Sequence, residues 1–226
     1  MKKIAVIVAG GSGKRMGNRL PKQFILLNNK PVLYYTLHTF LSTYDDLEII
    51  LVLAEEFVDM GQEIIDAYFE KDRIKIAIGG QSRFESVKNG LNLIEEEAII
   101  FVHDAARCLV SKELIQNCYT KALETGTAIP AVKCSDSLRT VNQAGGNEAL
   151  DREKVVLIQT PQVFHSKILL PAFNIDYKEW FTDEASVVEA FGMKVSLIEG
   201  EKQNIKITHP LDLIIAEQLL SETQLA

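Results

Sequence analysis

The sequence predicts an α/β fold built around a mostly parallel sheet, and three observations lead to this prediction. Short runs of apolar, often β-branched residues recur, as at residues 4–8 and 98–104, and such runs are typical of strands buried on both faces. Segments with helical apolar spacing lie between them, such as residues 57–69 and 112–124. With 226 residues, of which 47% are hydrophobic, the chain can bury one large core.

The expected elements follow one another in a regular order. Strands are expected at residues 4–8, 48–53, 74–78, 98–104, 127–132, 155–160 and 194–199. Helices are expected at residues 31–40, 57–69, 82–94, 112–124, from 182 onward and at 209–220. Because strands and helices alternate, the strands should run parallel with right-handed crossovers, which gives a Rossmann-like sheet with helices on both faces. We expect residues 1–226 to form a single domain.

Composition and charge exclude several classes of partner. The net charge of −7 argues against a nucleic-acid-binding surface, so a local group of basic residues suits a small anion. Cys108, Cys118 and Cys134 are odd in number and form no Cys-x-x-Cys pair, which is typical of reduced thiols that serve packing. No stretch approaches the roughly 18 apolar residues of a membrane span. We therefore expect a soluble, cytoplasmic protein that binds neither nucleic acid nor membrane.

A glycine-rich loop with basic residues follows the first strand. Residues 9–17 read Ala-Gly-Gly-Ser-Gly-Lys-Arg-Met-Gly, and Pro-Lys-Gln follows at residues 21–23. Backbone N–H groups of glycines can wrap an anion, and three nearby cations suit a polyphosphate. The loop fits neither a Walker loop nor a dinucleotide-binding fingerprint. The structural alternative is a glycine turn with a solvated basic rim.

These residues resemble the start of the sugar-phosphate nucleotidyltransferases, and most closely the cytidylyltransferases that act on 2-C-methyl-D-erythritol 4-phosphate. Further segments, in the expected order, extend the resemblance to about Leu220. It implies transfer of the cytidylyl group of CTP to 2-C-methyl-D-erythritol 4-phosphate in the non-mevalonate route to isoprenoids. The products are 4-diphosphocytidyl-2-C-methyl-D-erythritol and pyrophosphate. It also implies that Arg15 and Lys22 stabilise the transferring phosphate.

A second glycine segment, residues 79–87, follows an expected strand and opens a helix. Its glycines permit close backbone approach, and hydroxyls at a helix start can cap the helix or bind a base or ribose. Capping by Ser82 is the structural alternative, and the segment alone does not separate the two. The resemblance implies nucleotide binding by Ala9, Gly10, Gly11, Gly13, Gly80, Gln81 and Ser86.

A carboxylate, Asp104, ends the apolar run at residues 98–104. Ligands of α/β sheets bind beyond the carboxyl ends of parallel strands, and a desolvated aspartate needs a metal or a partner. We therefore expect Asp104 to bind Mg²⁺ or another divalent cation that gathers triphosphate oxygens; the alternative is that it caps a turn. The matching family motif has a proline where this chain has Cys108. The resemblance implies that Arg107 contacts substrate.

A polar segment, residues 135–155, reads as two strands around a Gly-Gly turn with little to pack on. Because an isolated hairpin is marginal in water, we expect it to lean on something else. In the resembled family this protruding arm embraces the partner of a homodimer and supplies an arginine and a threonine to its acceptor site. Those positions hold Arg152 and Ser137 here. The alternative is a solvent-exposed hairpin.

Three later motifs complete the pattern. Thr160-Pro-Gln is a family motif near the acceptor, so Thr160 is expected to bind substrate. Residues 182–186 read Thr-Asp-Glu-Ala-Ser, which is typical of the methylerythritol-phosphate enzymes; on physical grounds Thr182 is expected to be the N-cap, with acids at the positive end of the helix. The resemblance implies that Lys206 reaches the phosphates. Its structural alternative is an edge-strand charge. Because Gln203 precedes the asparagine of this motif, we expect no second metal carboxylate.

The reaction needs no protein nucleophile, since the acceptor phosphate attacks directly and catalysis rests on positioning and charge. We expect Arg15, Lys22, Lys206 and the partner's arm residue Arg152 to be the catalytic residues. One alternative is the same chemistry on another polyol phosphate, such as ribitol 5-phosphate. A remote alternative is a non-catalytic nucleotide-binding protein.

Overall fold

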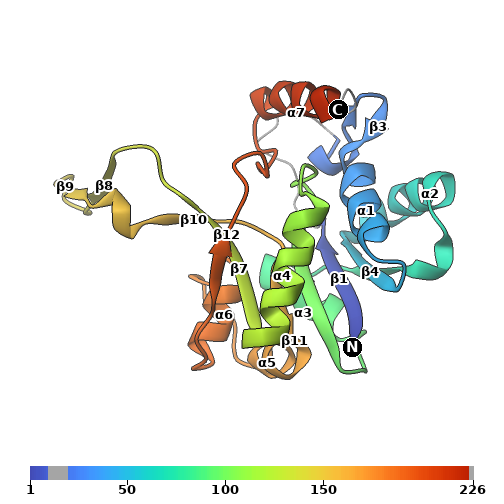
Figure 1. Cartoon of the computed structure of the whole chain (residues 1–226), viewed down its shortest axis with the longest axis horizontal. Coiled ribbons are helices and arrows are strands. Elements are labelled where there is room, and N and C mark those ends of the chain that lie inside the picture. The colour runs from blue at the N-terminus through green and yellow to red at the C-terminus, as the bar shows by residue number, and fades with distance from the viewer. Residues whose placement is uncertain (10–19, 224–226) are drawn as a thin grey trace.

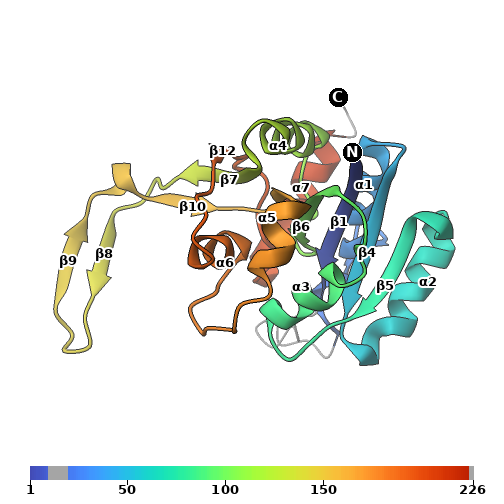
Figure 2. The ribbon, with the colours of Figure 1, turned by 90° about the horizontal axis from the view of Figure 1, so that it is seen from below.

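The computed structural model describes residues 1–9 and 20–223, and the glycine-loop residues at 10–19 lie outside them. In this part of the chain, eight strands form the central sheet in the order β10-β7-β11-β6-β1-β4-β5, with β12 paired to β7 (Figures 1 and 2). The strands are β1 (Lys2–Val8), β4 (Leu47–Leu53), β5 (Ile74–Ile78), β6 (Ala98–Asp104), β7 (Thr127–Lys133), β10 (Val156–Ile158), β11 (Gln162–His165) and β12 (Leu197–Glu199).

Helices cover both faces of this sheet, as the alternating pattern predicts. They are α1 (Val32–Thr43), α2 (Val58–Tyr68), α3 (Arg83–Leu91), α4 (Lys112–Thr125), α5 (Ser166–Ala172), α6 (Glu184–Ala190) and α7 (Pro210–Thr223). Residues of α1, α2 and α4 pack in one core cluster, and residues of α3, α5 and α6 pack in a second. The Rossmann-like α/β fold is confirmed.

The apolar runs form the sheet because alternate residues face opposite layers. In β1, Ala5 and Ile7 belong to the core cluster with α1, α2 and α4, whereas Ile4 and Val6 belong to the cluster with α3, α5 and α6. A strand that is buried on both sides needs apolar residues at every position, which is the pattern that the sequence carries. β1, β4, β5 and β6 run parallel.

The predictions fail where the chain leaves this regular alternation. Strand β11 and helix α5 were not expected; β11 inserts between β6 and β7 and is antiparallel to both. The strands expected at 155–160 and 194–199 are shorter. Residues 204–208 form no strand, so the alternative that Lys206 is an edge-strand charge is wrong. The helix expected at 82–94 ends at Leu91, and the N-cap of α6 is Asp183 rather than Thr182.

The segment at 135–155 forms a hairpin that projects from the body of the molecule (Figures 1 and 2). Strands β8 (Leu138–Val141) and β9 (Asn147–Leu150) pair antiparallel, as expected. Their side chains are largely exposed, and Val141 reaches 74% exposure. A two-stranded hairpin without a packed face is marginal by itself. What the arm leans on stays a prediction.

Two further features bear on the sequence predictions. All three cysteines are free thiols; Cys108 and Cys118 are buried, and Cys108 packs with Ile207 and Ala216 in a small core cluster beneath α7. Its role in packing is therefore confirmed.

Among residues 1–9 and 20–223, no helix is long and apolar enough to cross a membrane.

Candidate active site

A cavity of about 410 Å³ lies beyond the carboxyl ends of β1, β5 and β6. This is the edge at which open α/β sheets bind ligands, and the volume lies in the usual range for small-molecule sites. Its lining residues are Val8, Ala9, Lys22, Gln23, Gly80, Gln81, Ser82, Arg83, Ser86, Asp104, Ala105, Ala106 and Lys206. Seven predicted site residues thus lie together: Ala9, Lys22, Gly80, Gln81, Ser86, Asp104 and Lys206.

Asp104 is the anionic centre of this cavity. Lys206 Nζ lies 2.7 Å from its Oδ2, Arg83 Nη2 lies 3.2 Å from its Oδ1, and Arg107 Nε lies 3.9 Å from Oδ2. Burial alone would raise the pKa of Asp104, but the charges of Arg83, Lys206 and Arg107 outweigh it and hold the pKa well below its usual range. The carboxylate is therefore ionised at neutral pH.

Arg83 links this carboxylate to a second one. Its Nη1 lies 2.5 Å from Glu184 Oε1, and its Nη2 lies 3.2 Å from Glu184 Oε2. Burial raises the pKa of Glu184 above its usual range, and the charge and hydrogen bonds of Arg83 offset only part of that rise. Because both oxygens of Glu184 accept from a guanidinium that stays protonated, the bidentate contact is an ion pair. With Lys22, Arg107 and Lys206, the described part of the site holds four cations against two acids, a balance that suits phosphate.

A chain of hydrogen bonds fixes the backbone of Asp104. Its N–H donates to Thr160 Oγ1 at 3.1 Å, and Thr160 Oγ1 lies 3.1 Å from His103 Nδ1. His103 Nε2 lies 3.1 Å from the carbonyl oxygen of Arg107. Because a carbonyl oxygen can only accept a hydrogen bond, Nε2 carries the ring proton. Nδ1 therefore accepts a hydrogen bond from the Thr160 hydroxyl. Burial lowers the pKa of His103 to about 3, which keeps the ring neutral.

The segment that carries Lys206 is tied to the rest of the site through its backbone. Arg107 Nη1 donates to the carbonyl oxygen of Asn204 at 2.8 Å, and the N–H of Ile207 donates to the carbonyl oxygen of Ala106 at 2.9 Å. Lys22 Nζ donates to the carbonyl oxygen of Ile207 at 2.7 Å. Lys22 and Lys206 therefore reach the cavity from segments that hold each other in place.

The segment after β5, residues 79–87, both caps helix α3 and lines the cavity. Ser82 caps α3, because its hydroxyl accepts from the N–H of Glu85 and the Glu85 side chain accepts from the N–H of Ser82. Ser86 Oγ accepts from the N–H of Gly80 at 3.1 Å and also faces the cavity. A Cβ at position 80 would lie 2.3 Å from Glu85 Cβ, so only glycine fits there.

The remaining predicted residues lie elsewhere. Arg107 and Thr160 line an adjoining cavity of about 200 Å³ that shares Arg83, Asp104 and Lys206 with the first. Ser137 and Arg152 lie in the arm segment, where neither lines the two cavities of its own chain; Arg152 Nη1 donates to the carbonyl oxygen of Ser135 at 3.1 Å. Gly10, Gly11, Gly13 and Arg15 lie outside the described residues.

Asp104 is the one predicted metal ligand, and the described residues hold no cluster of three or more His, Cys, Asp or Glu side chains suited to a metal ion. Mg²⁺ commonly binds through one or two carboxylates and completes its shell with water and substrate phosphates. The donor set therefore fits a cation that arrives with a triphosphate and does not fit a cation held by the protein alone. Lys206, which occupies Oδ2, would have to yield that oxygen.

Sequence reasoning missed the residues that hold Asp104 from behind. Arg83 was seen only as part of a capping segment, and Glu184 only as an acid near a helix start. The side chain of Glu184 is 1% exposed, which is rare for a glutamate without a partner. A buried apolar helix face beginning with two acids was the available signal, but the partner on α3 follows only from the fold.

The fold and this cavity define a Rossmann-like α/β protein with a cation-lined pocket suited to phosphate groups. Comparison with known proteins narrows that class. Residues 3–222 match the model of the 2-C-methyl-D-erythritol 4-phosphate cytidylyltransferase family (IspD), so the chain belongs to this family of nucleotidyltransferases. The resemblance of the opening glycine loop to these enzymes is thereby confirmed.

Individual relatives agree over nearly the whole chain. The 2-C-methyl-D-erythritol 4-phosphate cytidylyltransferase of Bacteroides thetaiotaomicron is 44% identical over 220 residues, which cover 97% of this chain and 100% of the relative. The solved 4-diphosphocytidyl-2C-methyl-D-erythritol synthase of Anaerococcus prevotii is 28% identical, with a TM-score of 0.83 over 97% of this chain and 99% of the other. The cytidylyltransferase structure from Francisella tularensis is 32% identical, with a TM-score of 0.79 over 96% and 99%.

Proposed function

We propose that the cavity around Asp104 binds CTP and that its cations carry out the cytidylyl transfer of this family. The reaction joins the phosphate of 2-C-methyl-D-erythritol 4-phosphate to the α-phosphate of CTP and releases pyrophosphate. The observation that supports this assignment most strongly is the convergence of Arg83, Arg107 and Lys206 on one ionised carboxylate at the sheet edge where α/β ligands bind. Lys22 lines the same cavity.

The chemistry follows from the charges. An acceptor phosphate oxygen attacks the α-phosphorus, and the bond to the bridging oxygen of pyrophosphate breaks, so negative charge gathers on the leaving group. Lys22 and Lys206 place ammonium groups in the cavity where that charge develops, and Arg15 is proposed to join them from the glycine loop. The cytosine and ribose are proposed to lie beside Gly80 and the Ser86 hydroxyl, where the glycine leaves room for close approach to the backbone.

Asp104 is proposed to hold Mg²⁺, which, when bound, would neutralise triphosphate charge and orient the phosphates. Lys206, which pairs with Asp104 in this structure, would then face a phosphate. The low pKa of Asp104 keeps its carboxylate ionised for this exchange.

The arm is proposed to serve a second copy of the chain. Arg152 and Ser137 are too far along the arm to line the cavities of their own chain, and their exposed positions suit contact with a partner. In a homodimer they would hold the acceptor phosphate beside the partner's Asp104, with Arg107 and Thr160 of the adjoining cavity. We also place the reaction in the cytoplasm, where free thiols such as the three cysteines persist.

The direct test is pyrophosphate release from CTP and Mg²⁺ with three conditions: 2-C-methyl-D-erythritol 4-phosphate, ribitol 5-phosphate and no acceptor. Release only with the first supports the assignment. Release with ribitol 5-phosphate alone would move the acceptor to another polyol phosphate. CTP binding without release under any condition would contradict a catalytic role.

A further inference from the structure

The carboxylate that is proposed to bind metal is held by an arginine whose own charge is already balanced. Arg83 contacts Asp104 Oδ1 through both Nε, at 3.3 Å, and Nη2, at 3.2 Å, and contacts Glu184 through Nη1 and Nη2. The guanidinium of Arg83, at the start of α3, therefore bridges the carboxylates of Asp104 and Glu184. Asp104 Oδ2 is left facing Lys206 and the cavity. Of the two acids, only Asp104 lines the cavity.

Glu184 is fixed in place by more than this ion pair. Gln162, which is fully buried, accepts from the N–H of Ala185 at 2.8 Å and donates to Asp183 Oδ2 at 2.8 Å. Asp183 in turn caps α6 by accepting from the N–H of Ser186. The first turn of α6 is thus anchored from two sides, which holds the Glu184 carboxylate against Arg83.

The charge of Glu184 has a consequence for Asp104. Without that charge, three cations, Arg83, Lys206 and Arg107, would surround a single carboxylate, and Arg83 would have Asp104 as its one acidic partner. With it, Arg83 and Glu184 together are neutral, so only Lys206 and Arg107 offset the charge of Asp104. Once Lys206 turns to a phosphate, the negative charge of Asp104 is available to a further cation. Partners behind a metal ligand typically tune metal affinity about 10- to 100-fold.

We propose that Glu184 is a positioning residue that, through Arg83, reserves the charge of Asp104 for the divalent cation that accompanies the nucleotide. The proposal rests on the function assigned above and adds a role to two residues outside the predicted site. Arg83 orients Oδ1, and Glu184 prevents Arg83 from neutralising the carboxylate. The pair therefore sets how much Mg²⁺ the enzyme needs, and Glu184 itself lines neither cavity of the site.

The test uses Glu184→Gln, which keeps the shape and one acceptor but removes the charge. Two quantities are measured on the full chain: CTP affinity by calorimetry without divalent cation, and the Mg²⁺ concentration for half-maximal pyrophosphate release. We expect the Mg²⁺ requirement to rise about tenfold or more. Metal-free CTP affinity should stay equal or increase, because the site has gained positive charge.

Three controls separate this role from a structural one. Glu189→Gln removes the same charge from the exposed face of α6 and should change neither quantity. Glu184→Asp restores the charge and should recover most of the Mg²⁺ affinity that Glu184→Gln loses. Thermal unfolding of each variant shows whether it is folded. If Glu184→Gln does not fold, Glu184→Asp is compared with wild type instead. We then expect its Mg²⁺ requirement to rise by less than the roughly tenfold expected for Glu184→Gln, with metal-free CTP affinity unchanged.

The outcomes are distinct from those that test the function itself. A wild-type protein that releases no pyrophosphate contradicts the proposed function, whatever the variants do. An active wild type whose Mg²⁺ requirement is unchanged in Glu184→Gln overturns the inference alone. Equal losses of Mg²⁺ and metal-free CTP affinity, or equal defects in Glu184→Gln and Glu184→Asp, would also overturn it, since they indicate a role in shape rather than charge.

Discussion

Lys206 Nζ lies 2.7 Å from Asp104 Oδ2, so a lysine near the C-terminus closes an ion pair with the aspartate that ends β6. The lysine side chain is 37% exposed and the aspartate 12%, which places the pair at the cavity mouth rather than in the core. In the proposed reaction this contact would be exchanged: Asp104 would hold the metal ion, and Lys206 would face a phosphate.

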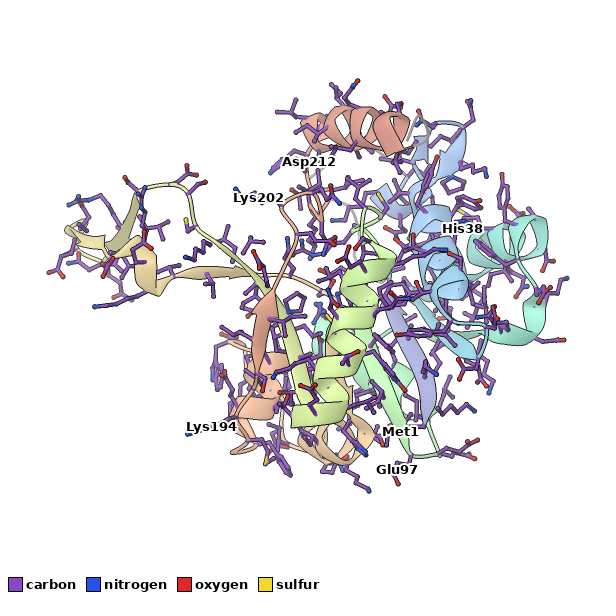
Figure 3. The ribbon with its side chains drawn as sticks, viewed as in Figure 1. Met1, His38, Glu97, Lys194, Lys202 and Asp212 are labelled. Atoms are coloured by element: carbon purple, nitrogen blue, oxygen red, sulfur yellow. The ribbon has the colours of Figure 1, made fainter. Side chains whose placement is uncertain are left out.

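Replacing Lys206 by alanine should lower kcat by about 100-fold or more, because a positioned cation that stabilises developing charge typically contributes that much. The reason is electrostatic, since the lysine would face phosphate when charge moves to pyrophosphate. The measurement is steady-state pyrophosphate release at saturating CTP and Mg²⁺. Lys202→Ala, on the same segment, is the matched control and should retain activity (Figure 3). A Lys206→Ala enzyme with normal kcat would show that the Asp104 contact is only structural.

The arm gives a prediction about two inactive variants mixed together. Arg152→Ala damages only the arm, and Lys206→Ala damages only the pocket, so each homodimer lacks every complete site. A mixed dimer has one pocket with Lys206 that faces an arm with Arg152, and random pairing of equal amounts makes about a quarter of all sites complete. Co-expression of the two chains should therefore recover about a quarter of wild-type activity.

The control for this experiment is the double variant, in which both changes lie on one chain. Co-expressed with wild type in equal amounts, it leaves no complete site in a mixed dimer, so activity should be about a quarter of wild type rather than about a half. If each arm serves its own chain, the two single variants will show no recovery. That result would contradict the arrangement proposed for Ser137 and Arg152.

The start of α7 provides a prediction about stability and pH. Asp212 Oδ2 accepts from the N–H groups of Thr208 and His209, both at 2.7 Å, and from Thr208 Oγ1 at 2.9 Å (Figure 3). Asp212→Ala removes these bonds and should lower the free energy of unfolding by about 1 kcal/mol at pH 7, as loss of a helix-capping carboxylate does. Urea titration measures it, with the exposed Glu217→Ala on the same helix as control.

The pH dependence has a definite sign. Burial opposes ionisation of Asp212, but the hydrogen bonds from Thr208 and His209 outweigh it and lower the pKa below that of the unfolded chain. The contribution is therefore complete above the unfolded pKa of about 3.9 and is lost as the pH falls through the lower folded pKa. The stability difference between wild type and Asp212→Ala should be constant from pH 7 to 5 and shrink below pH 4. A difference that grew in acid would exclude this role.

The sequence predicted the fold wherever burial alone decides the structure. The mostly apolar runs at residues 4–8 and 98–104 are typical of strands covered on both faces, and they occupy the centre of the sheet. Strand β11 was missed because it is stabilised by pairing with β6 and β7, which are distant in the sequence. The four residues 162–165 carry no pattern that predicts an antiparallel strand between β6 and β7. Residues 204–208 alternate like a strand but satisfy their backbone through Arg107 and Ala106 instead.

The site divides in the same way. Asp104 was predictable because a carboxylate at the end of a buried strand must lie at the ligand-binding edge of the sheet. Lys206 and Thr160 depended on the family resemblance, since their own surroundings in the sequence allow an ordinary strand. Arg83 and Glu184 were missed because a buried ion pair joins distant segments, and each partner alone resembles a common helix-start residue.

The central claim is that cations in the Asp104 cavity act on the transferring phosphate rather than on CTP binding. Lys22→Ala tests it most directly, with kcat from pyrophosphate release and CTP affinity from calorimetry, and with Lys75→Ala on the exposed side of β5 as control. We predict that kcat falls about 100-fold or more while CTP affinity changes by less than about threefold. An unchanged kcat, or a loss of CTP affinity that accounts for the whole defect, would contradict the account.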